Sequence, residues 1–138
     1  MYLVDTNIWL ERLLDQERSA EVARFLALVP TNRLCMSDFS LHSIGVILDR
    51  LDRSPVLLEF IDDVFGEGGV SLVSVAPEAS DRLVAVAQEY GLDFDDAYQY
   101  VAAETVDAEI VSFDADFVRT SRGCLLPGEI PESNDAVL

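Results

Sequence analysis

Lysine is absent from this 138-residue chain, all nine basic residues are arginine, and histidine occurs once. Against 26 acidic residues this gives a formal net charge of -17 and a pI near 4.1, which excludes a protein that grips nucleic acid with a basic surface. Disordered acidic chains are poor in apolar residues, whereas half of this chain is hydrophobic. We therefore expect a folded protein with surplus carboxylate on its surface.

Excess surface carboxylate without lysine resembles the composition of proteins adapted to molar salt. At roughly 1 M salt the Debye length falls to about 3 Å, so the self-repulsion of such a surface is largely screened. The composition favours a halophilic protein, and an ordinary acidic protein is the alternative.

Cysteine is also scarce, and Cys35 and Cys124 stand far apart without a C-x-x-C pair or a metal-ligand spacing. We expect both to be buried, reduced thiols. The longest uncharged apolar runs fall well short of the ~20 residues that a membrane span needs, and no signal-peptide pattern opens the chain. The expectation is a soluble, cytoplasmic protein that does not bind membranes.

The length is typical of one domain, so we predict a single domain over residues 1–138, with residues from about 124 to 138 as a loosely ordered tail. Apolar patterns predict strands at residues 2–4, 33–36, 70–75 and 110–113. Helical spacing, with Ser37-Asp38 and Pro77 as start signals and Gly91 as a stop, predicts helices at residues 8–14, 22–29, 38–51, 55–65, 77–90 and 97–104. Strands joined by such crossovers predict an α/β three-layer sandwich with a central, mainly parallel sheet flanked by helices.

Two carboxylates follow predicted strands directly: Asp5 after the first and Asp114 after the fourth. In a parallel sheet these strand ends share one edge, where α/β folds place their ligand sites. Asp96 stands at or near the start of a helix, whose dipole favours a carboxylate. The pattern therefore brings separate acids to one place, although most carboxylates in so acidic a chain only solvate its surface.

Carboxylates that converge within ~4–6 Å repel one another strongly unless a cation lies between them or some stay protonated. Oxygen ligands without a His or Cys partner favour a hard divalent ion, Mg²⁺ or Mn²⁺, over zinc. Such an ion lowers the pKa of bound water and stabilises a pentacoordinate phosphate, so the cluster suits hydrolysis of phosphodiesters.

Three segments together carry a family resemblance. The opening Tyr2-Leu3-Val4-Asp5-Thr6-Asn7-Ile8, the segment Asp95-Asp96-Ala97 and the segment Val111-Ser112-Phe113-Asp114-Ala115-Asp116-Phe117 resemble, in order and spacing, the acidic motifs of PIN-domain proteins. This is the metal-dependent ribonuclease fold of VapC-type toxins. The resemblance implies a central parallel sheet, Mg²⁺ or Mn²⁺ as cofactor, RNA as substrate, a homodimer and an antitoxin protein as a further partner.

Carried over to this sequence, the resemblance implies a catalytic set and a smaller set of metal ligands within it. The catalytic residues would be Asp5, Asp96, Asp114 and Asp116, and the metal ligands would be Asp5, Asp96 and Asp114. Asp93 and Asp95 compete with Asp96 for the third-motif position. Thr6 or Asn7 would brace Asp5 through hydrogen bonds.

The segment after the second predicted strand departs from the family. The family places a Glu about six residues beyond a Ser like Ser37, whereas this chain has Ser43, preceded by His42, and matches a subgroup with a Leu-His-Ser-Ile-Gly segment. The loss of that carboxylate favours an alternative, a PIN-fold protein without catalysis that serves as a dimerising or protein-binding module.

His42 is a candidate general base or substitute ligand, although a lone helical His is more often packed or hydrogen-bonded. A receiver-like phosphotransfer domain lacks support because the chain has no lysine to stand at a strand end.

Overall fold

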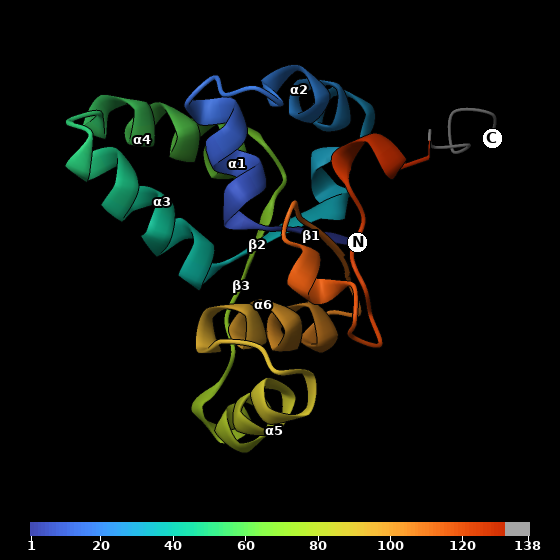
Figure 1. Ribbon diagram of the computed structural model, residues 1–138. Coiled ribbons are helices and arrows are strands. Elements are labelled where there is room, and N and C mark those ends of the chain that lie inside the picture. Colours follow the sequence, from blue (N-terminus) through green and yellow to red (C-terminus); the bar gives the residue numbers. More distant parts are fainter. Residues whose placement is uncertain (132–138) are drawn as a thin grey trace.

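A four-stranded parallel sheet with the order β3-β2-β1-β4 lies at the centre of the computed structural model, which describes residues 1–131 (Figure 1). Its strands are β1 (Tyr2–Val4), β2 (Leu34–Ser37), β3 (Ser71–Val73) and β4 (Glu109–Val111). From β1 the chain adds β2 and β3 on one side and returns to add β4 on the other. The strand order therefore reverses between β1 and β4, the position at which open α/β sheets bind ligands.

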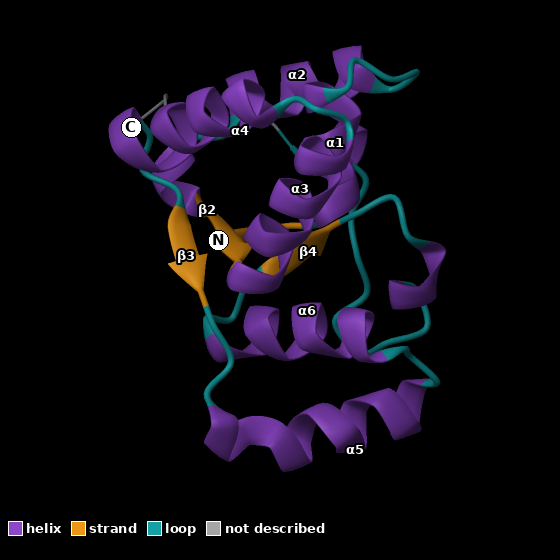
Figure 2. Cartoon of the chain, turned by 90° about the vertical axis from the view of Figure 1, so that its left-hand side faces the viewer, coloured by secondary structure: helices purple, strands orange, loops and turns teal. Residues whose placement is uncertain are grey.

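Helices cover both faces of this sheet. The α-helices are α1 (Thr6–Leu13), α2 (Ser19–Leu28), α3 (Asp38–Arg50), α4 (Ser54–Ile61), α5 (Ser80–Tyr90) and α6 (Phe94–Thr105). Short 3-10 turns are η1 (Thr31–Arg33), η3 (Pro77–Ala79), η4 (Ala115–Phe117) and η5 (Pro127–Glu129), and η2 (Asp62–Glu67) is π-helical. Figure 2 shows α1 to α4 on one face, α6 against the other and α5 outermost.

The alternation of side chains along the strands divides the core in two. Tyr2 and Val4 of β1 pack with α1 to α4, whereas Leu3 packs with Cys35 and with α5 and α6. The central strands β1 and β2 are thus buried on both faces, as expected for a parallel sheet between two helical layers, whereas Ser71 and Leu72 of the edge strand β3 are exposed. The predicted three-layer α/β sandwich is confirmed.

Several local signals predicted from the sequence are also confirmed. The Ser37 side chain caps α3 by accepting a hydrogen bond from the Ser40 N–H. Gly91 ends α5 in the left-handed region at φ 63°, where a side chain is strained.

Three predicted elements end earlier than expected, because the backbone finds other hydrogen-bond partners. The predicted strand at 110–113 ends at Val111, since the Phe113 N–H donates to the Asn7 side chain. The strand predicted at 70–75 ends at Val73, and the Val75 N–H donates to the Tyr98 hydroxyl. The α-helix predicted to reach residue 65 ends at Ile61 and continues as η2.

The described part of the C-terminal region runs beside the sheet. Leu125 forms an isolated parallel bridge with Val111, and Pro127 and Ile130 are buried. Residues 132–138, which form half of the expected loose tail, lie outside the described residues. Both cysteines are free, and Cys35 is buried as predicted, whereas Cys124 is only half-buried. Within residues 1–131 no helix is long and apolar enough to cross a bilayer.

Candidate active site

The candidate site lies at the carboxyl ends of β1 and β4. Asp5 follows β1 directly, and its backbone N–H donates to the Val111 carbonyl at the end of β4 over 3.0 Å. Asp114 stands three residues beyond Val111, and Asp96 enters from the first turn of α6. These acids line one pocket of about 380 Å³, together with Asp93, Asp95 and Asp116. The convergence predicted from the strand ends is therefore present.

Asp5 is the centre of what we call the inner network, formed by Asp5, Thr6, Asn7, Ser37, Ser40, Gln99 and Ser112. Its side chain is buried, with 6% of the residue exposed, and both oxygens accept hydrogen bonds. Oδ1 accepts from the Thr6 N–H at 2.8 Å and from Gln99 Nε2 at 2.7 Å. Oδ2 accepts from Ser112 Oγ at 2.7 Å and from Asn7 Nδ2 at 3.4 Å. Burial raises the pKa of Asp5 above its ordinary value, while the bonds from Ser112 and Gln99 act in the opposite direction.

Gln99 ties this network together and was missed by sequence reasoning. It is fully buried on α6, donates to Asp5 and to Ser40 Oγ at 2.7 Å, and accepts from the Ser37 hydroxyl. Ser112 and Ser40 were missed as well. The available signal was the position of Gln99 three residues after Asp96, on the helix face that also carries Tyr100 and Ala103 toward the core.

The supporting residues predicted for Asp5 take up two different roles. Asn7 binds Asp5 directly, and its Oδ1 also holds the Phe113 N–H after β4. The Thr6 hydroxyl instead donates to Ser40 Oγ at 2.8 Å, so only its backbone N–H reaches the carboxylate.

Asp96, Asp114 and Asp116 form a second group, the outer cluster. Each offers a carboxylate oxygen within 4.8 Å of the others, and they are half-buried, half-buried and exposed, respectively. Local hydrogen bonds set their positions: the Asp93 side chain caps α6 by accepting from the Asp96 N–H, and Asp114 Oδ1 accepts from the Asp116 N–H. Among the three candidates for the third-motif position, only Asp96 belongs to this cluster. Asp93 and Asp95 line the pocket outside it.

The outer cluster is electrostatically unfavourable without a cation. Burial raises the pKa of Asp96 to about 7, and the next largest causes are the charges of Asp114 and Asp93. One basic side chain, Arg119, reaches the cluster, where its Nη1 lies 3.2 Å from Asp116 Oδ1. The other nitrogens of Arg119 bind the carbonyls of Tyr90 and Gly91.

A hard divalent cation fits this donor set. Three carboxylate oxygens at mutual distances below 4.8 Å, without sulfur or imidazole among them, are ligands that Mg²⁺ and Mn²⁺ prefer. Protonation of Asp96, which its raised pKa favours, is the alternative response to the same crowding. The outer cluster is thus able to bind a cation.

The α3 wall of the pocket carries no carboxylate. Ser43 lines the pocket, together with the apolar side chains of Phe39 and Ile47. His42, the predicted substitute ligand or base, is exposed on α3 and is not part of the lining. The structure does not bring His42 to the acids.

A three-layer sandwich with acids at the reversal of its parallel sheet defines a class of small α/β proteins with their ligand site at that edge. Within this class the chain belongs to the PIN domain family, whose model matches residues 2–123. A search of curated protein sequences gives no match.

Solved structures share the fold at low sequence identity. A toxin–antitoxin complex from Klebsiella pneumoniae has a TM-score of 0.74 at 21% identity, with 94% of this chain and 100% of the other covered. VapC20 of Mycobacterium tuberculosis, described as a sarcin–ricin loop cleaving toxin, has a TM-score of 0.72 at 17% identity, with 88% and 95% covered. FitAcB from Neisseria gonorrhoeae has a TM-score of 0.74 at 18% identity, with 94% and 100% covered.

Proposed function

We propose that the protein is a metal-dependent endoribonuclease that hydrolyses RNA phosphodiesters. The observation that carries the proposal is the convergence of Asp96, Asp114 and Asp116 beside the buried Asp5, at the point where the strand order reverses. Membership in the PIN domain family supports the same chemistry.

In this proposal Asp96 and Asp114 hold Mg²⁺ or Mn²⁺ directly, Asp116 completes the acidic set, and Asp5 is a further ligand. Asn7 makes the longest of the four hydrogen bonds to Asp5, so Asp5 Oδ2 is the oxygen of this carboxylate that would be available to an ion. A bound ion supplies Lewis acidity and lowers the pKa of coordinated water. The protein residues hold the acids in place: Gln99 and Ser112 orient Asp5, and the Asp93 cap fixes Asp96.

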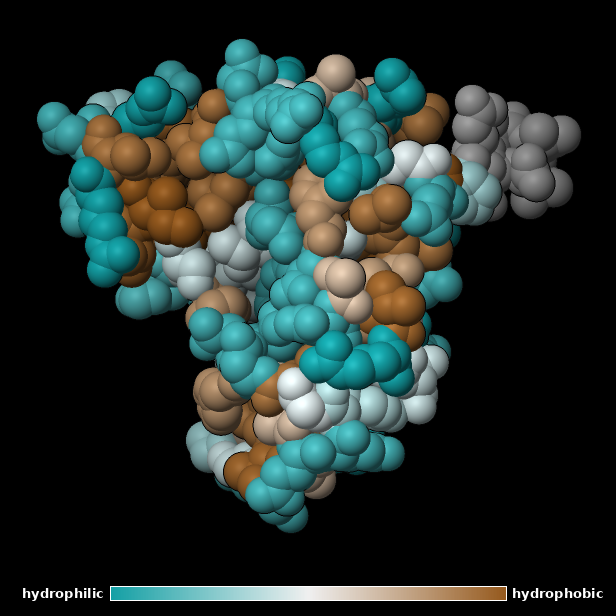
Figure 3. Space-filling view, viewed as in Figure 1, coloured by the Kyte–Doolittle hydropathy of each residue, from teal (hydrophilic) through white to brown (hydrophobic). Residues whose placement is uncertain are grey.

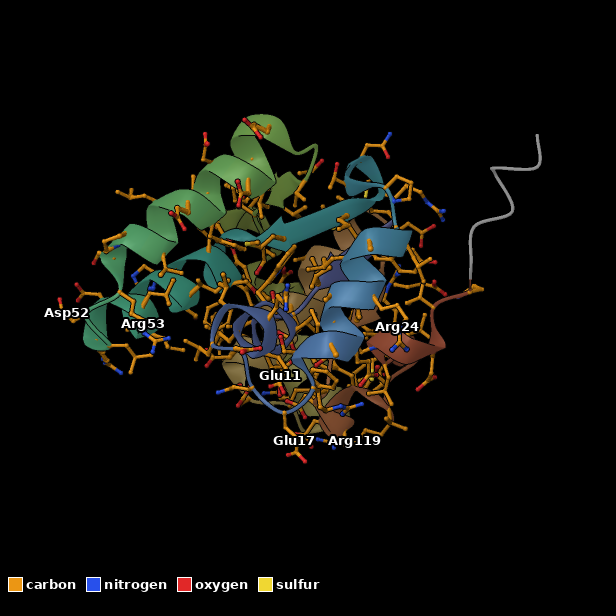
Figure 4. All side chains as sticks on the ribbon, turned by 90° about the horizontal axis from the view of Figure 1, so that it is seen from above. Glu11, Glu17, Arg24, Asp52, Arg53 and Arg119 are labelled. Carbon is orange, nitrogen blue, oxygen red and sulfur yellow. The ribbon has the colours of Figure 1, made fainter. Side chains whose placement is uncertain are left out.

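The acidic surface limits how RNA approaches the site. The nine arginines provide no basic surface: Arg18, Arg82 and Arg122, for example, pair with carboxylates, and Arg24, Arg53 and Arg119 lie apart from one another (Figure 4). We propose that RNA binds through the ion at the acids, in salt that screens the net charge of -17. This agrees with a halophilic, cytoplasmic protein.

Cleavage of RNA tests the proposal directly. The purified protein, with Mn²⁺ in high salt, is expected to cut single-stranded or structured RNA, and Asp96→Asn is expected to abolish cutting. Asp95→Asn is the matched control, because it removes the same charge one residue away from the outer cluster. Intact RNA across a varied set of substrates would overturn the proposal, as would equal activity of Asp96→Asn and the native protein.

A toxin role within a toxin–antitoxin pair extends this proposal. Two of the similar structures are named as a toxin–antitoxin complex and a toxin. An apolar surface lies over α3 and α4 (Figure 3), where Leu51 and Leu58 are 49% and 69% exposed. We propose that such surface is covered by an antitoxin or by a second copy in a homodimer. Light scattering on the purified protein tests the homodimer, and co-purification with the product of a neighbouring small gene tests the antitoxin.

A second candidate is a PIN-fold binding module without catalysis. It is favoured by Ser43, which leaves the α3 wall of the pocket without a carboxylate. Calorimetric titration distinguishes the two: stoichiometric Mn²⁺ uptake that Asp96→Asn removes supports the nuclease, and no uptake supports the binding module.

A further inference from the structure

A second cavity, which we call the side pocket, opens beside the acids. It has a volume of about 240 Å³ and is lined mainly by Phe113, Ala115, Val118, Cys124, Leu126 and Glu129. Asp114 lines both this cavity and the acidic pocket. A group bound in the side pocket is therefore adjacent to a group bound at the outer cluster.

Backbone hydrogen bonds fix the walls of the side pocket. The Leu125 N–H donates to the Ile110 carbonyl at 2.8 Å, and the Ser112 N–H donates to the Leu125 carbonyl at 3.0 Å. Leu125 thus pairs with the edge of the sheet at Val111 by an isolated bridge, and Cys124 and Leu126 on either side of Leu125 both line the cavity. The walls are preformed rather than assembled by a ligand.

The other walls are anchored as well. The Gly128 N–H donates to Glu21 on α2, so η5 is attached to that helix. The Arg18 guanidinium lies 4.0 Å from the centroid of the Phe113 ring and holds it by a cation–π contact. Pocket walls that need no rearrangement bind with less loss of conformational entropy.

The chemistry of the lining is selective. Most of its side chains are apolar, and the polar ones include Ser112, Asp114 and Glu129. Ser112 and Asp114 are engaged at the acidic site, whereas the exposed Glu129 carboxylate makes no hydrogen bond or ion pair within residues 1–131. The volume is below the ~300–1,000 Å³ of pockets that enclose whole small molecules, so it suits one flat ring system rather than a complete nucleotide. The lining is complementary to a planar apolar group that presents hydrogen-bond donors at one edge.

We propose that the side pocket binds one unstacked RNA base next to the scissile phosphate and that Glu129 selects guanine. This inference rests on the proposed nuclease function. Guanine presents two adjacent donors, N1–H and the N2 amino group, which match the two oxygens of a carboxylate. Uracil offers a single donor between two carbonyls, and adenine and cytosine place an acceptor beside their amino group. Sequence-specific recognition of RNA commonly reads such splayed bases at their Watson–Crick edges.

Nucleoside binding to the native, metal-free protein tests the pocket without relying on catalysis. Guanosine, inosine and adenosine are compared by saturation-transfer NMR at high salt. Inosine lacks only the N2 amino group of guanosine, so guanosine is expected to bind roughly tenfold more tightly. Equal binding of guanosine and inosine would overturn the assignment of the carboxylate.

Variants assign the effect to named residues. Glu129→Gln is expected to weaken guanosine binding roughly tenfold and to remove the difference from inosine. Val118→Trp, at a residue that is 69% exposed at the pocket, is expected to block all three nucleosides without unfolding the protein. Glu59→Gln, on α4 and in neither pocket, is the matched loss of one charge and is expected to change nothing.

Cleavage of oligoribonucleotides that carry one guanosine or one inosine separates this inference from the proposed function. Cleavage without preference for guanosine or inosine, unchanged in Glu129→Gln, would support the nuclease function and contradict the base pocket. No cleavage of any RNA, with guanosine still bound at Glu129, would support the base pocket and contradict the nuclease function. Loss of dimerisation or of a protein partner in Val118→Trp, with nucleoside binding unchanged, would assign the pocket to a protein contact instead.

Discussion

The inner network and the outer cluster place the same residue type in opposite electrostatic surroundings. Asp5 is buried and has hydrogen-bond donors on both oxygens, and two of the four donors, Gln99 and Ser112, come from distant parts of the chain. Asp96 and Asp114 are half-exposed, close to each other, and have few donors. Hydrogen bonds from Ser112 and Gln99 offset part of the cost of burying the Asp5 carboxylate, whereas burial and the charges of Asp114 and Asp93 raise the pKa of Asp96 to about 7. The two groups of acids thus differ in their hydrogen-bond donors rather than in their position at the strand ends.

Removing the amide that satisfies the inner network is expected to have the largest effect on stability. Gln99→Leu leaves Asp5 Oδ1 with one donor and leaves the hydroxyls of Ser37 and Ser40 without their amide partner in a buried setting. We expect a loss of about 3 kcal/mol in the free energy of unfolding, and a fall of roughly 10 °C in Tm. Gln88→Leu, at an exposed position on α5, is the control in thermal unfolding followed by circular dichroism. A similar Tm for both variants would mean that Asp5 does not need the network.

Removing a carboxylate of the outer cluster is expected to act on metal binding rather than on the fold. Asp96→Asn should weaken Mn²⁺ binding by about 30- to 100-fold, because the cluster loses one of three carboxylate oxygens. Calorimetry measures this affinity, with Asp95→Asn and Asp93→Asn as controls that also test the other candidates for the third-motif ligand. Loss of uptake in Asp95→Asn, with Asp96→Asn unaffected, would reassign the ligand.

The pH dependence of stability is expected to report the raised pKa of Asp96 without any metal. The pKa of Asp96 is raised from 3.8 to about 7 in the folded protein, so between these values the folded protein holds a proton that the unfolded chain has released. The free energy of unfolding of the metal-free protein must therefore fall as pH rises toward 7, and level off above it. Tm measured in chelator from pH 5 to 8 at constant high salt should fall less for Asp96→Asn than for Asp95→Asn. Parallel curves would contradict the raised pKa.

Sequence patterns predicted the layers of the fold and the acids, because both depend on local signals. Apolar runs mark the strands, and a carboxylate directly after a run, such as Asp5, marks the sheet edge. The position of Asp96 followed from its place at the start of α6, and the Asp93 cap that fixes it is likewise local.

The bond from Asn7 to Asp5 was predicted, but the rest of the inner network could not be, because its bonds join residues far apart in the chain. Gln99 meets Asp5 across 94 positions, and Ser112 meets Asp5 across 107. From the sequence alone, Gln99 resembles a surface amide on a helix. Its buried position follows only from the fold, which places it at the ends of the strands. The side pocket could not be predicted for the same reason: Phe113 and Glu129 become neighbours only because Leu125 pairs beside β4.

Adding a carboxylate on α3 is expected to have the smallest effect and to sharpen the same comparison. Ser43→Glu places an acid on the wall of the pocket that lacks one. In a partly exposed site the added attraction to a divalent ion is on the order of 1 kcal/mol, or roughly fivefold in Mn²⁺ affinity. The metal-free variant should be less stable than the native protein at pH 8, because one more charge joins the outer cluster without a donor. His42→Glu adds the same charge at an exposed position outside the pocket, so it reports the effect of net charge alone. An equal gain in both variants would mean that the ion responds to the charge of the surface rather than to a ligand at residue 43.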